Sequence, residues 1–256
     1  AAIRRGNKSQ FASTQEHRQR IVNLIKDYRT LLGQGVVARF DPETYSDAVA
    51  FARIGEGSLG GKARGLAFMN SMILKHRLYD KHANVRIMIP RSVVIATDYF
   101  DDFIRLNGLK YIISQEFSDE EILSEFVSST VPARLQQELK AYIQTVRTPL
   151  AVRSSSKLED SHYQPFAGIY STYMIPYVDN GDQMLRLLLK AVKSVYASVY
   201  FATSRAYLSS SQNLISEEKM AVIIQEVCGT EQDGLFFPTF SGVARSINYY
   251  PIGDEA

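Results

Sequence analysis

The sequence predicts a mixed α+β domain, and three observations support this prediction. Apolar residues recur at helical spacing in several segments, most clearly at 134–146 and 182–207. Shorter stretches rich in β-branched residues, such as 87–97, separate them. Residues 220–227 form a nearly continuous apolar run, which is typical of a strand buried on both faces. Because both element types are interspersed, a pure helical bundle is excluded.

The helices are predicted from apolar faces at a spacing of three and four residues. In the segment 134–146, for example, Leu135, Leu139 and Tyr142 fall on one face. The same pattern predicts an N-terminal helix from His17 that ends near Gly33. The further predicted helices are 63–74, 98–106, 119–127, 134–146 and 182–207.

The strands are predicted from β-branched and alternating residues. Pro90 interrupts the first of them, since proline has no N–H for a sheet ladder. The predicted strands are 87–97, 150–153, 168–174 and 220–227, with 241–247 as a neighbour of the last. Ser154 to Gln164 is expected to be a polar loop.

Composition limits the class of function. With 29 basic and 27 acidic residues the net charge is +2, too balanced for nucleic-acid binding through overall charge. No apolar run approaches the roughly 20 residues needed to cross a bilayer. The single Cys228 cannot form an internal disulfide, which favours a reducing compartment. We therefore expect a cytoplasmic protein that binds neither nucleic acid nor a membrane.

Both ends of the chain indicate a piece of a longer protein. Ala1 stands where an initiating Met is expected, and the chain stops at Ala256 without an obvious helix or strand ending. We expect two parts: a polar segment, helix and connector at 1–46, and a main domain at 47–256 that is incomplete at its C-terminus.

A glycine-rich loop opens one of the predicted helices. Gly60-Gly61-Lys62 offers a phosphate group unobstructed backbone N–H groups, a helix N-terminus and a cation. It is not a Walker A loop, because Glu56 and Ala63 stand where that motif has glycine and Ser or Thr. A flexible turn followed by an exposed lysine explains the residues equally well.

A second candidate follows the strand predicted at 150–153. Arg153 can hold a phosphate through two hydrogen bonds, and the hydroxyls of Ser154, Ser155 and Ser156 can donate others. Spacing alone favours a simpler explanation, in which Arg153 pairs with Glu159 or Asp160 at the surface.

Six blocks in order resemble one family. They are Gly60-Gly61-Lys62-Ala63-Arg64-Gly65-Leu66-Ala67-Phe68-Met69, residues 89–99, Ala151-Val152-Arg153-Ser154-Ser155-Ser156 with 159–160 and 166–168, residues 197–200, residues 220–226, and Ser241-Gly242-Val243-Ala244. Together they resemble the nucleotide-binding domain of the pyruvate phosphate dikinase and phosphoenolpyruvate synthase family.

The resemblance implies an ATP-grasp-like fold, with ATP between two α+β subdomains. ATP would phosphorylate a histidine on a separate swivelling domain, which passes the phosphoryl group to pyruvate or another acceptor. The implied ATP-binding residues are Gly60, Gly61 and Lys62, then Arg153, Ser154 and Ser155 at the phosphates, and Gln225, Glu226, Val227 and Cys228 beside adenine.

Simpler roles remain open for some of these residues. Gln225 and Glu226 can be the solvent-facing end of a buried strand, and Cys228 is better explained as a packing residue than as a nucleophile. The four histidines match no phosphohistidine motif, so no catalytic residue and no metal ligand is identified within the chain.

The chain departs from the family pattern near its end. Ile247 replaces an arginine and Tyr249 a proline, although Arg245 could supply the charge from the same strand face. The Mg²⁺ ligands, the phosphohistidine domain and the acceptor-binding domain are expected beyond Ala256. We therefore expect weak ATP binding and no turnover by this chain alone. The alternative to an enzyme part is a non-catalytic module for nucleotide sensing or partner binding.

Overall fold

The computed structural model describes residues 18, 37–43, 45, 49–113, 117–156, 169–210 and 218–244. Apart from Arg18, the predicted N-terminal helix lies outside these residues. Glu159, Asp160, Arg245, Ile247 and Tyr249 also lie outside them.

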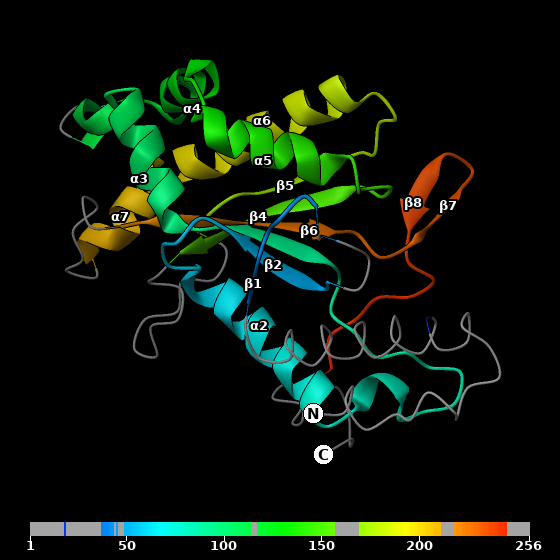
Figure 1. The fold of residues 1–256 in the computed structure, drawn as a ribbon. Helices are drawn as coiled ribbons and strands as arrows, with labels where there is room; N and C mark the ends of the chain where they lie inside the picture. The colour runs from blue at the N-terminus through cyan, green and yellow to red at the C-terminus, as the bar shows by residue number, and fades with distance from the viewer. Residues whose placement is uncertain are drawn as a thin grey trace.

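The centre of the fold is a six-stranded mixed sheet with the order β1-β2-β3-β6-β4-β5 (Figure 1). The strands are β1 (Ala38–Arg39), β2 (Phe51–Ile54), β3 (Ser92–Ile95), β4 (Leu150–Ser156), β5 (Thr172–Ile175) and β6 (Met220–Glu226). β1, β2 and β3 are parallel, whereas β6, β4 and β5 each run antiparallel to their neighbour. The late strand β6 thus lies between β3 and β4, and its residues Met220 to Ile224 are fully buried, as predicted.

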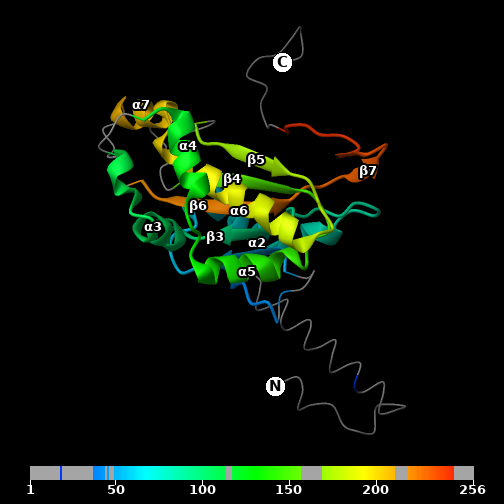
Figure 2. The same cartoon turned by 90° about the horizontal axis from the view of Figure 1, so that it is seen from above.

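Helices cover both faces of the sheet (Figures 1 and 2). One face carries α3 (Thr97–Leu106), α4 (Asp119–Ser128), α5 (Ala133–Ile143) and α6 (Gly181–Ala197), and the other carries α2 (Gly60–Lys75). The remaining elements are η3 (Leu78–Asp80), η4 (Leu109–Ile113), η6 (Ser198–Tyr200), α7 (Ala202–Ser210) and the hairpin of β7 (Thr230–Gln232) and β8 (Leu235–Phe237). This mixture confirms the predicted α+β class.

The two faces of the sheet pack against cores of different size, and side chains alternate between these cores along each strand. Val222 and Ile224 of β6 belong to the large core under α3 to α6, whereas Ala221 and Ile223 belong to a small core under α2. Only the first turn of α2 is buried, and Phe68 of that helix is exposed.

Several predicted elements have different bounds in the structure. The predicted helix 182–207 ends at Ala197, because η6 and the extended backbone of Phe201 separate it from α7. Ser154 to Ser156 continue β4 instead of starting a loop. Ser241 to Ala244 form no strand, since β3 and β4 already pair with both edges of β6. Within the described ranges, no helix combines the length and apolar character needed to cross a bilayer.

Candidate nucleotide site

The glycine-rich loop joins β2 to α2, and its glycines are needed for close packing within the protein. Gly60 has a φ of 70°, and a Cβ at this residue would lie 1.8 Å from the carbonyl oxygen of Ser155. The start of α2 is thus pressed against the end of β4. Only glycine allows this approach, because any side chain would collide with backbone atoms that cannot move aside.

Side chains of the protein itself occupy several N–H groups of this loop. The N–H of Glu56 donates to Asp98 (2.9 Å) and the N–H of Ser58 to Thr97 (3.0 Å). At the helix start, the N–H of Ala63 donates to the hydroxyl of Ser155 (3.0 Å). The loop therefore offers an anion fewer open backbone donors than its sequence predicts.

Lys62 points from the first turn of α2 to β4. Its Nζ donates to the Oγ of Ser154 at 3.1 Å, across 92 residues of sequence. Ser154 follows Arg153 directly on β4, so this contact brings Lys62 to the strand that carries Arg153, although successive side chains of a strand point to opposite faces. No acidic residue lies in the first turn of α2, which leaves the positive end of the helix dipole uncompensated there.

A chain of hydrogen bonds across the sheet orients Arg153. Its Nη1 donates to the Oε1 of Gln225 on β6 at 3.1 Å. The Nε2 of Gln225 in turn donates to the hydroxyl of Ser92 on β3 at 3.1 Å. Both amide atoms of the buried Gln225 are thus used to hold the guanidinium. The predicted surface pairing of Arg153 with Glu159 or Asp160 involves acids outside the described residues.

Glu226 is part of a buried ion pair and is not a solvent-facing strand end. The Nε of Arg91 donates to its Oε1 at 2.5 Å, and the two side chains are 12% and 17% exposed. Arg91 also donates to the carbonyl of Thr145 (3.0 Å) and lies 5.5 Å from the centre of the Tyr45 ring. Burial lowers the pKa of Arg91, but the hydrogen bond and the charge of Glu226 outweigh burial and raise that pKa above its ordinary value.

A cavity of about 860 Å³ opens where β6 ends, and its size falls in the range of ligand sites. Its wall includes Arg91, Thr145 and Thr148, together with the predicted adenine-side residues Glu226, Val227 and Cys228. The N–H groups of Glu226 and Val227 already donate to the carbonyls of Arg91 and Pro149, each at 2.9 Å. Hydrogen bonds from the backbone to a base here would therefore have to come from carbonyl groups, or from N–H groups of residues after Val227.

Neither Lys62 nor Arg153 lines this cavity. The structure thus brings the predicted residues together in two groups, one where the start of α2 meets β4 and one at the end of β6, and the hydrogen bond from Arg153 to Gln225 joins them. Sequence reasoning assigned no role to the residues that hold these groups in place: Arg91, Ser92, Thr97 and Asp98 fall within the block 89–99 that resembles the family, but none was predicted as a site residue. The signal that could have drawn attention to them was this block, with a charge beside a run of β-branched residues.

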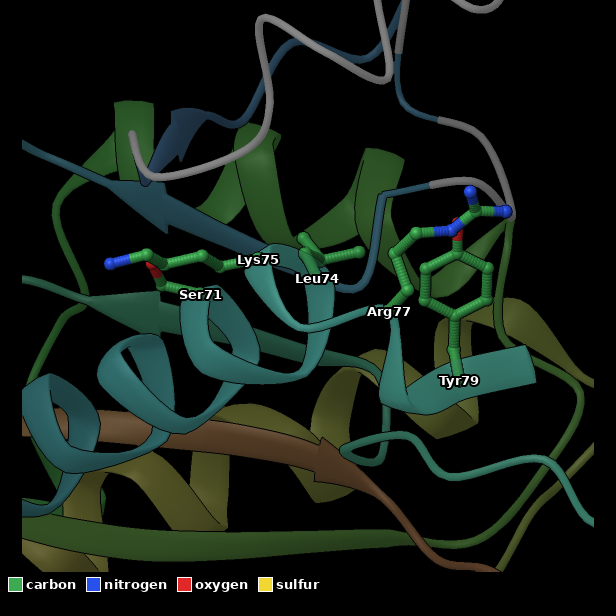
Figure 3. Close-up of a pocket in the computed structure, with 5 residues that line it drawn as sticks. All are labelled: Ser71, Leu74, Lys75, Arg77 and Tyr79. Carbon is green, nitrogen blue, oxygen red and sulfur yellow. The ribbon is translucent and has the colours of Figure 1, made fainter. Parts of the chain in front are cut away.

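A second hollow, of about 580 Å³, lies at the C-terminal end of α2. Figure 3 shows Arg77 and Tyr79 side by side on one side of Leu74, with Ser71 and Lys75 on the other. None of the predicted site residues lines it. In the described part of the chain, no three His, Cys, Asp or Glu side chains gather in a way that could hold a metal ion.

Comparison with known proteins gives a family match over most of the chain. The model of the family described as pyruvate phosphate dikinase, AMP/ATP-binding domain, matches residues 56–255.

Two curated relatives are similar over most of the chain. An uncharacterized phosphotransferase, YvkC of Bacillus subtilis (strain 168), is 28% identical over 193 residues, which are 74% of this chain and 20% of that protein. A phosphoenolpyruvate synthase of Aeropyrum pernix is 24% identical over 200 residues, which are 70% of this chain and 22% of that protein. The chain thus spans about a fifth of the length of each relative.

Proposed function

The chain belongs to the pyruvate phosphate dikinase AMP/ATP-binding family, and from this premise we propose that it holds ATP along β4 and β6 for phosphoryl transfer. The single observation that carries the proposal is the contact of Lys62 with Ser154, beside Arg153. This contact supports the proposal because it connects the glycine-rich loop to the strand of the second predicted cation, which is far away in sequence. In this proposal, the fold is the ATP-grasp-like one and the two cations receive the phosphates.

The geometry of the strands supports an extended nucleotide. Ser154 lies opposite Val222 and Leu150 lies opposite Glu226, so the two ends of the proposed site are four residues apart. At about 3.3 Å per residue this separation is about 13 Å, comparable to the span of an extended nucleoside triphosphate. The base would lie beside the segment 225–228, and the phosphates would extend from Arg153, which contacts Gln225, towards Lys62.

Phosphoryl transfer depends mainly on positioning and on neutralising negative charge. Arg153 is suited to this task because Gln225 fixes its guanidinium before any ligand binds. Lys62 supplies a second positive charge from another element. ATP is expected to bring Mg²⁺, whose protein ligands are expected beyond Ala256.

A pair of lysine variants on one helix tests the proposal. We expect Lys62→Met to weaken ATP binding by about 1.4 kcal/mol or more, which is at least about tenfold. Adenosine has no phosphates, so its affinity should not change. Lys75→Met removes an equal charge from the other end of α2 and serves as the control. Calorimetric titration would contradict the proposal if Lys62→Met bound ATP as tightly as the unaltered chain.

For the whole protein, we propose that ATP phosphorylates a histidine on a separate domain, which passes the phosphoryl group to pyruvate or another acceptor. The names of the two relatives, a phosphotransferase and a phosphoenolpyruvate synthase, support this proposal. ATP labelled at its β- or γ-phosphate should leave label on the full-length protein that acid removes and base does not.

The alternative is a non-catalytic module that senses a nucleotide or binds a partner. Two observations favour it. Ile247 departs from the family pattern, and the backbone N–H groups of Glu56 and Ser58 in the loop already donate to side chains of this protein instead of being open to a phosphate. A full-length protein that binds ATP but never acquires phosphate label would support this alternative.

A further inference from the structure

We propose that Thr97 and Asp98, at the start of α3, are positioning residues that set the place of Lys62 by holding the glycine-rich loop. The inference rests on the proposed function, because the role of Lys62 at the phosphates comes from it. Neither Thr97 nor Asp98 lines the cavity at the end of β6, so both act through the loop.

The contacts between α3 and the loop are reciprocal. The hydroxyl of Thr97 accepts the N–H of Ser58 at 3.0 Å, and the N–H of Thr97 donates to the carbonyl of Ser58 at the same distance. One residue further on, the Oδ2 of Asp98 accepts the N–H of Glu56 at 2.9 Å. Thr97 is only 5% exposed, so water competes little for its hydroxyl.

These side chains do not cap their own helix. The N-cap of α3 is Ala96, which makes no side-chain cap, and Thr97 and Asp98 are the first two residues of the helix. The hydroxyl of Thr97 and the Oδ2 of Asp98 both accept hydrogen bonds from the loop and not from their own helix. Their use on the loop instead indicates that loop geometry is what they maintain.

The loop lies in close contact with the start of α3. A Cβ at Gly57 would lie 2.6 Å from the backbone nitrogen of Asp98 and 2.7 Å from the hydroxyl of Thr97. A Cβ at Gly55 would lie 2.5 Å from the carboxylate of Asp98. Two loop glycines are thus explained by the approach of α3, as Gly60 is by the approach of β4.

A short and fixed path connects this contact to the lysine. The hydroxyl of Ser58 accepts the N–H of Gly60 at 3.3 Å, and Gly60 begins the helical turn that carries Lys62. On the other side of the loop, the hydroxyl of Ser155 donates to the carbonyl of Leu59 at 2.8 Å. The turn is thus held between α3 and β4, and loss of the α3 contacts would allow the ammonium group to move from Ser154.

The test compares three variants of the 256-residue chain. Thr97→Val removes the hydroxyl and keeps the shape, and Thr97→Ser restores the hydroxyl. Ser118→Ala is the matched control, since it removes a hydroxyl that accepts a helical N–H at α4, away from the loop. For each variant we would measure the affinity for ATP, the affinity for adenosine, the melting temperature, and hydrogen exchange of residues 55–63.

We expect Thr97→Val to weaken ATP binding about tenfold, the equivalent of one hydrogen bond, to leave adenosine binding unchanged and to speed exchange at 55–63. The ATP affinity of Thr97→Ser should stay within about twofold of that of the unaltered chain. Ser118→Ala should lower the melting temperature while the ratio of ATP to adenosine affinity stays the same. A purely structural role would not change this ratio.

Two results would overturn the inference alone: ATP affinity that falls in Lys62→Met but not in Thr97→Val, or equal losses of ATP and adenosine affinity in Thr97→Val. If Lys62→Met itself leaves ATP binding unchanged, the proposed function fails and this inference fails with it. The Lys62→Met measurement therefore separates the two failures.

Discussion

A methyl group added at Gly60 meets different surroundings from one added at Gly65, although both residues belong to α2. At Gly60 the φ of 70° is unfavourable for alanine and the methyl would overlap the Ser155 carbonyl, whereas at Gly65 nothing lies within 4 Å. We expect Gly60→Ala to lower the free energy of unfolding by at least about 2 kcal/mol. Gly65→Ala should raise it by about 0.5–1 kcal/mol through helix propensity. Urea unfolding curves of equal midpoint for the two variants would contradict the packing of Gly60 on β4.

The ion pair of Arg91 and Glu226 makes a second prediction for single residues. Both side chains are largely buried but line the cavity at the end of β6, so Arg91→Met should leave a carboxylate without its cation and cost about 1–3 kcal/mol of stability. The double variant Arg91→Met with Glu226→Leu should recover a large part of this loss, because no buried charge remains. A double-mutant cycle in urea measures the coupling, and additive losses would show that the two groups do not interact.

Motifs in the sequence predicted Lys62 and Arg153 but not the residues that place them. The partner of Lys62 is 92 residues away and the partner of Arg153 is 72 residues away. Such contacts depend on which strands are neighbours in the sheet, and local sequence patterns do not reveal the order of the strands. The same limit explains why Ser92 and Thr97 were not recognised as supports of the site.

At the scale of elements, the clearest local signal is the start of α4. The N–H of Glu121 donates to the hydroxyl of Ser118, and the N–H of Ser118 donates to the carboxylate of Glu121, which is a capping box. The hydrogen bond from the Ser118 backbone, and then the one from its hydroxyl, lowers the pKa of Glu121 below the ordinary 4.5.

This pKa sets a pH dependence of stability. Because the folded-state pKa lies below the unfolded one, the carboxylate stabilises the fold above about pH 4.5, and this contribution is lost as the pH falls through the lower folded value. Glu121→Gln keeps the hydrogen bonds and removes the charge. We expect its melting temperature to lie below that of the unaltered chain at neutral pH and to converge with it in acid. A difference that does not change with pH would contradict the role of the charge.

The elements with strong periodicity were predicted well, and the short ones were not. The apolar spacing at 134–146 corresponds to α5, and the apolar run at 220–227 corresponds to β6. β2 has only four residues, which is too short for a recognisable pattern before the glycine-rich loop. The hairpin of β7 and β8 was also missed, although Asp233-Gly234, both with positive φ, is a typical hairpin turn.

For the whole molecule, the place of β6 makes folding a single event. β6 pairs with β3 on one edge and with β4 on the other, so residues from distant parts of the chain share one sheet and one core. We expect far-ultraviolet circular dichroism and tyrosine fluorescence to report one coincident transition in urea. Two separate transitions would show that the parts before and after β3 are independently stable.

The same strand order has a consequence for synthesis on the ribosome. β3 is complete at Ile95, but its partner β6 is complete only at Glu226. At a translation rate of about 5–20 residues per second, β3 is without that partner for on the order of ten seconds, and β4 for part of that time. During this interval the nascent chain exposes strand edges and apolar side chains, which are the features that chaperones bind and that lead to aggregation. Slow or paused translation between residues 95 and 226 should therefore lower the yield of soluble protein more than the same pause after Glu226.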